Sequence, residues 1–387
     1  MSAKQLGWLG VALGAIAWYI TLPPVLVRTP IPSVLIAAGA VAAGVAAVRR
    51  EERRLGRAAI AAGLLGGIAA VVATRSGVGN LEKVFVWSAL FAAMLRFATP
   101  LLLAALGGLL SERSGVINVG LEGMMLMGAF FGIFGADLFG SWVVGMLVGI
   151  AAGGMLACVH AVFSIALRAD QVVSGVAVNL LALGITGYVF IAHYGDQGTP
   201  GDVSRAPEIE LPGVKEIPFL GDVIGDMNVL TWLALLLVPL VALYLFRTPG
   251  GLRLRSVGEK PRAADSVGIP VLRTRYLAVI GSGCLAGLGG VYLSVALVGS
   301  FNQGMTAGRG FIALAVVIFG AWRPFGALAG ACLFGFSSAV AQRLPAFSES
   351  LAVLFQALPY VLVLVVVAGL IGRSRPPAAI GVPYVKE

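Results

Sequence analysis

The residues best suited to do chemistry lie in a charged, glycine-containing stretch between two apolar segments, Ser111–Met125. Within it, Asn118 and Glu122 are four residues apart, a spacing that places both on one face of a helix. An ionised glutamate in an apolar helix is costly unless its charge is paired or lies at a helix N-terminus. We therefore expect Asn118 and Glu122 near a path through the protein or near its gate. An ordinary loop followed by a capped helix is the alternative interpretation.

A second polar stretch spans residues 301–315 and combines Asn302, Gln303, Thr306 and Arg309 with glycines. This pattern predicts irregular backbone, which is tolerated at membrane depth only where it lines a wet cavity or is buried in protein. We expect Asn302, Gln303 and Arg309 to lie beside the same path. The alternative is a loop-to-helix junction from which Arg309 extends its charge toward the membrane surface.

The third feature is a basic loop, residues 247–275, that contains a short predicted helix. Pro261 suits a helix start and Gly268 a helix end, with about two turns between them. The small Ala263 and Ala264, flanked by charges, could dock into a groove on a soluble partner. A basic surface loop held at lipid headgroups is the alternative interpretation.

Several catalytic patterns are missing from the sequence. It has no Gly-Lys dipeptide and therefore no Walker A loop, no His-Glu-x-x-His zinc motif and no Gly-x-Ser-x-Gly nucleophile elbow. Few carboxylates, Glu122 and Asp137, lie inside apolar segments, which disfavours a proton- or sodium-driven carrier. We expect neither a catalytic residue nor a metal site in this chain.

These features are embedded in an apolar chain. Of its 387 residues, 59% are hydrophobic and 12% are charged, whereas a soluble globular protein has roughly 25% charged residues. The composition excludes a soluble enzyme, a disordered protein and a nucleic-acid-binding domain. We expect an all-α, polytopic membrane helical bundle, because helices satisfy their own backbone groups in lipid.

A membrane-spanning helix needs about 20 apolar residues, and about twelve hydrophobic segments qualify or come close, some of them possible half-helices. Phe311–Ala321 is short for a span, and Val84–Leu110 is long and contains Pro100, where it could kink or break. The segments are Leu6–Val27, Ile31–Val48, Ala58–Thr74, Val84–Leu110, Leu121–Phe139, Trp142–Leu167, Val172–Ala192, Val229–Phe246, Tyr276–Val298, Phe311–Ala321, Phe325–Ala341 and Leu351–Ile371.

Loop charges predict the orientation of the bundle. The linker at residues 49–57 and the loop at 247–275 are basic, whereas the long loop at 193–228 is acidic. Because basic loops favour the cytoplasm, the acidic loop should be external and both termini cytoplasmic. We expect an N-terminal transmembrane extension with a basic cytoplasmic linker, residues 1–83, followed by a working core, residues 84–387.

Three stretches of the sequence resemble the permease subunits of ABC importers of the branched-chain amino acid/simple sugar group. They are Ser-Glu-Arg-Ser-Gly-Val-Ile-Asn-Val-Gly-Leu-Glu-Gly-Met-Met from Ser111, Val-Gly-Glu-Lys-Pro-Arg-Ala-Ala-Asp-Ser-Val-Gly-Ile from Val257, and Gly-Arg-Gly-Phe-Ile-Ala-Leu-Ala from Gly308. The similarity covers roughly Phe85 to Gly372 and is greatest to the nucleoside (basic membrane lipoprotein-linked) branch. Lys260 stands where the group usually has asparagine.

The resemblance implies a transport subunit that is not itself an enzyme. A separate cytoplasmic ATPase would dock on the short predicted helix Pro261–Gly268, which is the coupling helix of this family. The ATPase would use ATP and Mg²⁺, whereas this chain would bind no cofactor. An extracytoplasmic binding protein would deliver the small-molecule substrate, and a second permease subunit, commonly a different chain, would complete the path across the inner (plasma) membrane. The residues implied at the ATPase contact are Glu259, Pro261, Arg262, Ala263, Ala264, Asp265 and Gly268.

We therefore expect the permease of an ATP-driven importer that gives alternating access, with nucleosides as substrates. A simple sugar or a branched-chain amino acid is the alternative substrate within this class. Outside the class, a stand-alone secondary carrier or channel would transport without any ATPase. An intramembrane enzyme would need catalytic residues that the sequence lacks.

Overall fold

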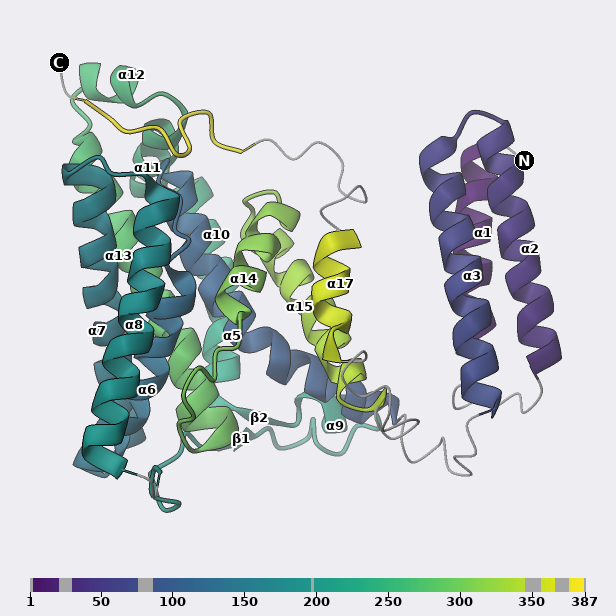
Figure 1. Ribbon diagram of the computed structural model, residues 1–387, viewed down its shortest axis with the longest axis horizontal. Coiled ribbons are helices and arrows are strands. Elements are labelled where there is room, and N and C mark those ends of the chain that lie inside the picture. The colour runs from purple at the N-terminus through teal and green to yellow at the C-terminus, as the bar shows by residue number, and fades with distance from the viewer. Residues whose placement is uncertain are drawn as a thin grey trace. The chain divides into compact units, whose positions relative to one another are not determined.

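The computed structural model describes residues 3–20, 30–75, 86–195, 198–344, 356–365 and 376–385 (Figure 1). The chain divides into two compact units, one made of Met1–Leu90 with Val340–Gln356 and the other of Phe91–Ala339 with Ala357–Glu387. The expected all-α bundle is confirmed. Within the described ranges, strands are limited to one short antiparallel pair.

In the described part of the smaller unit, three helices pack against one another. They are α1 (Ala3–Tyr19), α2 (Pro30–Arg49) and α3 (Arg53–Arg75). The turn at residues 50–52 joins α2 to α3 and belongs to the basic linker that the sequence predicted. The predicted span Leu6–Val27 lies partly outside the described residues.

The larger unit contains the remaining elements. They are α5 (Trp87–Arg113, entering from the smaller unit), α6 (Leu121–Phe139), α7 (Trp142–Ala161) with the π-turn η1 (Val162–Ala166), α8 (Gln171–Tyr194), β1 (Glu208–Glu210), α9 (Leu220–Ile224), β2 (Asp226–Asn228), α10 (Val229–Arg247), α11 (Pro249–Glu259), α12 (Pro261–Ser266), α13 (Val271–Val291) with the π-helix η3 (Tyr292–Val298), α14 (Arg309–Phe319), α15 (Pro324–Ala341) and α17 (Leu358–Val365).

Eight helices of the described part are long and apolar enough to cross a membrane. The structure thus supports a multi-pass bundle but does not test all twelve predicted segments, and Leu351–Ile371 lies largely outside the described residues. α14 has only 11 residues, about 16 Å of helix, and is therefore a half-helix. α5 continues through Pro100, so that proline does not end the helix.

The core of the larger unit depends on close backbone approach among α6, α7 and α13. A Cβ at Gly153 of α7 would meet the backbone of Gly283 and Gly287 on α13, so only glycine fits at this contact. Small residues permit such approach in membrane bundles. The glycine-containing faces of α7 and α13 are therefore contact surfaces.

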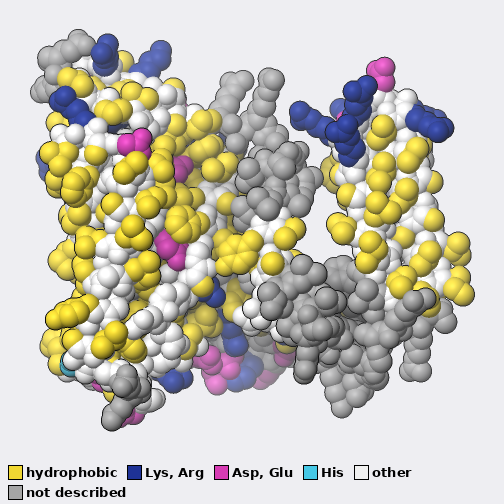
Figure 2. Space-filling model, viewed as in Figure 1, with side chains coloured by type: hydrophobic (Ala, Val, Ile, Leu, Met, Phe, Trp, Pro, Cys, Tyr) yellow, Lys and Arg dark blue, Asp and Glu magenta, His cyan; other side chains and the backbone are white. Residues whose placement is uncertain are grey.

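The two ends of the larger unit differ in character. Figure 1 places α11, α12 and the C-terminal segment at one end, and the β1–β2 pair with α9 at the other. Figure 2 shows apolar side chains over the flank and Lys and Arg side chains gathered at the α12 end. At the β1–β2 end, Lys215 pairs with Glu210 at 3.0 Å, and this hydrogen-bonded carboxylate raises the pKa of Lys215.

Candidate functional site

Glu122 holds the N-terminus of the half-helix α14. Its Oε1 accepts a hydrogen bond from the Gly308 backbone N–H at 2.8 Å, and its Oε2 accepts one from Gly310 at 2.6 Å. Gly308 has a φ of 79°, and a Cβ at Gly310 would run into the Glu122 backbone. The first N–H groups of a helix lack intrahelical partners and carry partial positive charge, so a carboxylate stabilises them. The negative charge of Glu122 is thus stabilised by the N-terminus of a second helix, α14.

The other end of α14 is held through Trp322, in the turn before α15. The Trp322 indole Nε1 donates to Glu112 Oε2 at 2.5 Å. The Arg113 guanidinium donates to the Trp322 carbonyl oxygen through Nε at 3.0 Å and Nη2 at 2.8 Å. Glu112 and Trp322 are each only 4% exposed.

Both ends of α14 are therefore held by residues that flank one connection, the loop between α5 and α6. We call the set Glu112, Arg113, Glu122 and Trp322, with the Gly308 and Gly310 amides, the α14 clamp. The two polar stretches that the sequence singled out separately meet in this clamp. Glu112 and Arg113 lie in the first polar stretch, whereas Trp322 was not among the predicted site residues. The sequence features that could have indicated this contact are the charged pair Glu112-Arg113 and the indole of Trp322, each beside a helix end.

Asn118 lies in the α5–α6 connection and supports it from within the bundle. It is fully buried, and its Nδ2 donates to Ser282 Oγ on α13 at 3.0 Å. Neighbouring backbone groups are also satisfied by side chains. Ile117 N–H donates to Gln171 Oε1 at 2.8 Å, and Asn179 Nδ2 donates to the Val119 carbonyl at 3.0 Å. The irregular backbone here is thus buried in protein.

Asn302, Gln303 and Arg309 lie in or directly after the coil between η3 and α14. Asn302 and Gln303 are exposed. Arg309 is half-buried, and its Nη1 donates to the carbonyl oxygens of Met305 at 2.9 Å and Thr306 at 3.2 Å. Within the described residues, no hydrogen bond joins the side chains of Asn302 or Gln303 to Glu122 or Asn118. The structure therefore joins Glu122 to the start of α14 but leaves Asn302 and Gln303 on an open surface.

Tyr360 on α17 borders the same coil and was not among the predicted site residues. Its hydroxyl donates to the Ala307 carbonyl oxygen at 2.8 Å, and its side chain is 48% exposed. A Cβ at Gly308 would be in van der Waals contact with the ring. An aromatic face thus lies beside polar Arg309 and the open coil.

The predicted coupling helix exists as α12, with Pro261 at its first position. Ala264 is 3% exposed and packs in a small cluster with Val257, Val271 and Tyr384. The outward surface is formed by other residues, notably Arg262, Ala263, Val267 and Gly268, with Glu259 before the helix and Asp265 half-exposed. Ala264 therefore anchors α12, and a partner would meet its neighbours.

The C-terminal segment, residues 376–385, lies across the base of this coupling helix. Ala379 N–H donates to the Gly258 carbonyl at 2.9 Å, and Gly381 N–H donates to the Gly115 carbonyl at 3.1 Å. Arg275 Nη1 donates to the Val382 carbonyl at 3.0 Å. The segment thus ties the end of α11 to the α5–α6 connection and to α13. No periodic pattern in the sequence indicated it.

The described residues hold no group of three or more His, Cys, Asp or Glu side chains placed to bind a metal ion. The polar groups described above instead cap helix ends and satisfy irregular backbone. This arrangement can hold a half-helix at both ends and connect it mechanically to the exposed helix α12.

A family described as "Branched-chain amino acid transport system / permease component" matches residues 90–367. The chain is 42% identical to the guanosine ABC transporter permease protein NupQ of Bacillus subtilis, over 79% of this chain and 99% of that protein. It is 38% identical to the nucleoside ABC transporter permease protein NupC of Lactococcus lactis, over 76% of this chain and 96% of that protein.

A third relative carries a different substrate in its name. It is the putative glucose ABC transporter permease protein TsgC13 of Haloferax volcanii, 42% identical over 67% of this chain and 78% of that protein. No solved structure matches the chain.

Proposed function

Since the chain belongs to the family of branched-chain amino acid transport system permease components, we propose that it is the permease subunit of an ATP-driven importer of nucleosides. One observation carries the substrate class: the 42% identity to a guanosine permease along 99% of that relative. The expected family resemblance is confirmed, and the nucleoside substrate rests on the named relatives.

The chain is a multi-pass protein of the plasma membrane, and its described residues include eight helices apolar enough to cross it. We propose about twelve crossings with both termini cytoplasmic, which the basic loops support. The proposed division into an extension, 1–83, and a core, 84–387, is supported by the family match, which begins at residue 90.

The partner that supplies energy is, in this proposal, a cytoplasmic ATPase seated on α12. Arg262, Ala263 and Val267 are exposed and form the proposed contact surface. The ATPase could bind them without unfolding α12, because Ala264 already anchors the helix. ATP and Mg²⁺ belong to that ATPase. A substrate-binding protein outside the membrane and a second permease subunit, commonly a different chain, complete the transporter.

The structure supports a physical route from α12 to the half-helix. A displaced α12 would pull on the C-terminal segment and on Gly258, and through them on the α5–α6 connection at Gly115. That connection carries Glu112 and Glu122, which hold the two ends of α14. Movement of the ATPase would thus change the position of α14 without any covalent chemistry in this chain.

The surface beside the start of α14 has the chemistry that a nucleoside needs. Tyr360 offers an aromatic face, and Asn302 and Gln303 offer hydrogen-bonding amides. Aromatic stacking on a base contributes about 1–3 kcal/mol in nucleic-acid complexes. We propose that these residues border the path, with Arg309 shaping the coil behind them.

Substrate competition tests this proposal. The complete transporter, with its co-purifying partners, is expressed in cells that lack nucleoside uptake, and labelled guanosine uptake is measured. Excess adenosine or uridine should compete, whereas glucose and leucine should not. The glucose name of one relative makes a sugar the second candidate, and labelled glucose uptake blocked by other sugars would replace the nucleoside proposal.

A further inference from the structure

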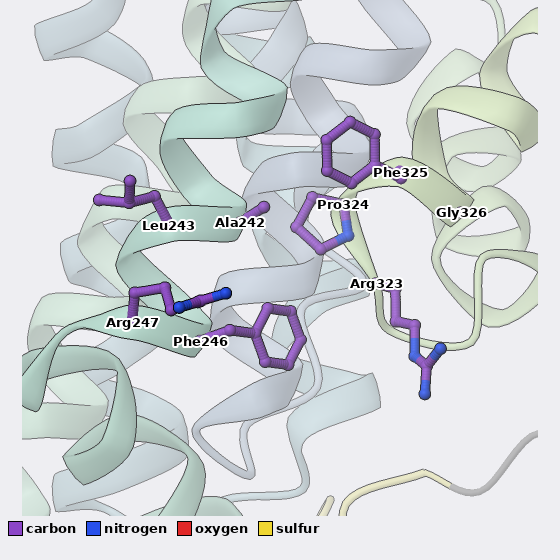
Figure 3. Close-up of a pocket in the computed structure, with 8 residues that line it drawn as sticks. All are labelled: Ala242, Leu243, Phe246, Arg247, Arg323, Pro324, Phe325 and Gly326. Carbon is purple, nitrogen blue, oxygen red and sulfur yellow. The ribbon is translucent and has the colours of Figure 1, made fainter.

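An apolar groove lies between the last turn of α10 and the first turn of α15 (Figure 3). Its volume is about 700 Å³. Leu243 and Phe246 contribute from α10, and Pro324 and Phe325 contribute from α15. In Figure 3, Phe246 projects from α10 toward the turn that carries Pro324.

Two arginines, Arg247 and Arg323, belong to the lining of this groove. Both are exposed, and in the described part of the chain neither side chain has a hydrogen bond or an ion pair. Unpaired guanidinium groups at the edge of an apolar surface favour a planar, anionic, oxygen-bearing ligand.

More positive charge surrounds the same place. The Arg255 guanidinium lies over the Phe246 ring, 5.1 Å from its centroid. Arg113 interacts electrostatically with both Arg255 and Arg323, and with one acidic side chain, Glu259. The cationic groups around the groove therefore outnumber the acidic ones near it, because Glu112 is already engaged by Trp322.

We propose that this groove binds one anionic phospholipid, with its phosphate between Arg247 and Arg323 and an acyl chain along Leu243, Phe246 and Phe325. The apolar walls identify the source of the phosphate: Leu243 is 57% and Phe325 is 60% exposed, and a free phosphate would gain nothing from them. Basic pockets between membrane helices on the cytoplasmic side suit anionic headgroups.

A bound lipid would also stabilise a moving part of the molecule. Arg323 directly follows Trp322, which the clamp holds at the end of α14. A phosphate on Arg323 would therefore favour the clamped turn. This inference does not depend on the identity of the substrate.

Native mass spectrometry of the purified transporter complex provides the test. The complex is supplied with phosphatidylglycerol or phosphatidylcholine, and the lipid retained on this chain is counted. R247Q/R323Q should weaken phosphatidylglycerol binding by about tenfold, because two charge contacts at exposed arginines are lost and each such contact is weak. The matched control, R168Q/R273Q, removes two other exposed arginines and should bind as the wild type does.

Three results would overturn the proposal. One is equal loss in the control pair, and another is equal retention of both lipids by the wild type. The third is displacement of phosphatidylglycerol by inorganic phosphate, which would make the site one for a free anion.

A second measurement identifies the occupant directly and needs no loss of function. Benzoylphenylalanine replaces Phe325 in the intact transporter and is photolysed in native membranes. A crosslink to phospholipid, weakened in R247Q/R323Q, supports the proposal. A crosslink to the second permease subunit or to the ATPase shows that a protein covers the groove and contradicts it.

Discussion

The α14 clamp and the coupling helix α12 solve the same problem, fixing a short helix, in opposite ways. The clamp uses charged side chains: Glu122 caps one end of α14, and Glu112 with Arg113 holds Trp322 at the other. The coupling helix instead depends on backbone hydrogen bonds and a small apolar cluster around Ala264.

The difference follows from the surroundings of the two helices. Irregular backbone inside a bundle has no water to satisfy it, so polar side chains must do so. The outer residues of α12 are exposed, so this helix can keep one face open to solvent. In the clamp, the loss of a single charged side chain should therefore lower the stability. On α12, the exposed face remains available to a partner protein.

Removal of Glu122 should lower the free energy of unfolding more than any other change considered for the two short helices. Glu122→Ala leaves the Gly308 and Gly310 amides without their acceptor, at a cost of about 4 kcal/mol in unfolding free energy. Thermal unfolding in detergent measures the loss. Glu122→Gln should fall between the alanine variant and the wild type. Glu216→Ala, which removes an exposed carboxylate, should change little, and an equal loss in that control would refute the cap.

Trp322→Phe tests the other end of the clamp. It removes the indole N–H donor together with part of the ring and leaves buried Glu112 without this hydrogen bond, which should cost about 2.5 kcal/mol. Trp232→Phe is the matched control, because the Trp232 Nε1 has no hydrogen-bond partner within the described residues. Guanidinium or thermal unfolding compares the two. Equal destabilisation would mean that packing, and not the hydrogen bond to Glu112, explains the effect.

Tyr384→Ala tests the C-terminal segment at the base of α12. Loss of this buried ring from the Ala264 cluster should cost about 1.5 kcal/mol, less than a deep core truncation because the cluster is small. Hydrogen exchange should rise at residues 261–268 and remain unchanged at α14. The exposed Val385→Ala serves as the control. Unchanged exchange in α12 would show that the segment does not hold it.

Val267→Arg should have the smallest effect on stability and a large effect on assembly. Val267 is 75% exposed, so unfolding should change by less than about 0.5 kcal/mol. Co-purification of the ATPase should nevertheless fall sharply if α12 is its seat. Val267→Ala should retain the partner. If the arginine variant co-purified fully with the ATPase, α12 would not be the docking surface.

The sequence located both polar stretches but not their meeting. Apolar run lengths predicted the helices well, because hydropathy is a local property. Glu122 and Gly308 are distant in sequence, and only the three-dimensional packing of α6 beside α14 brings them together. The helical phase of α12 was also beyond reach, since two turns give too few residues to show which alanine faces inward.

The C-terminal segment shows a second limit. Its contacts are made largely by backbone groups at Gly115, Gly258 and Ala379. Because every residue type has these backbone groups, such contacts can hardly be predicted from the sequence. Tyr360 was missed for a related reason, because its role comes from one hydroxyl contact to Ala307.

The most direct test of the central claim is nucleoside uptake into proteoliposomes that contain the purified transporter and its binding protein. ATP is supplied on the ATPase side, and the same preparation is made with the Val267→Arg permease. We expect accumulation that requires both ATP and the ATPase and that is lost in the variant. Accumulation by this chain alone, without ATPase or ATP, would contradict it and identify a stand-alone carrier.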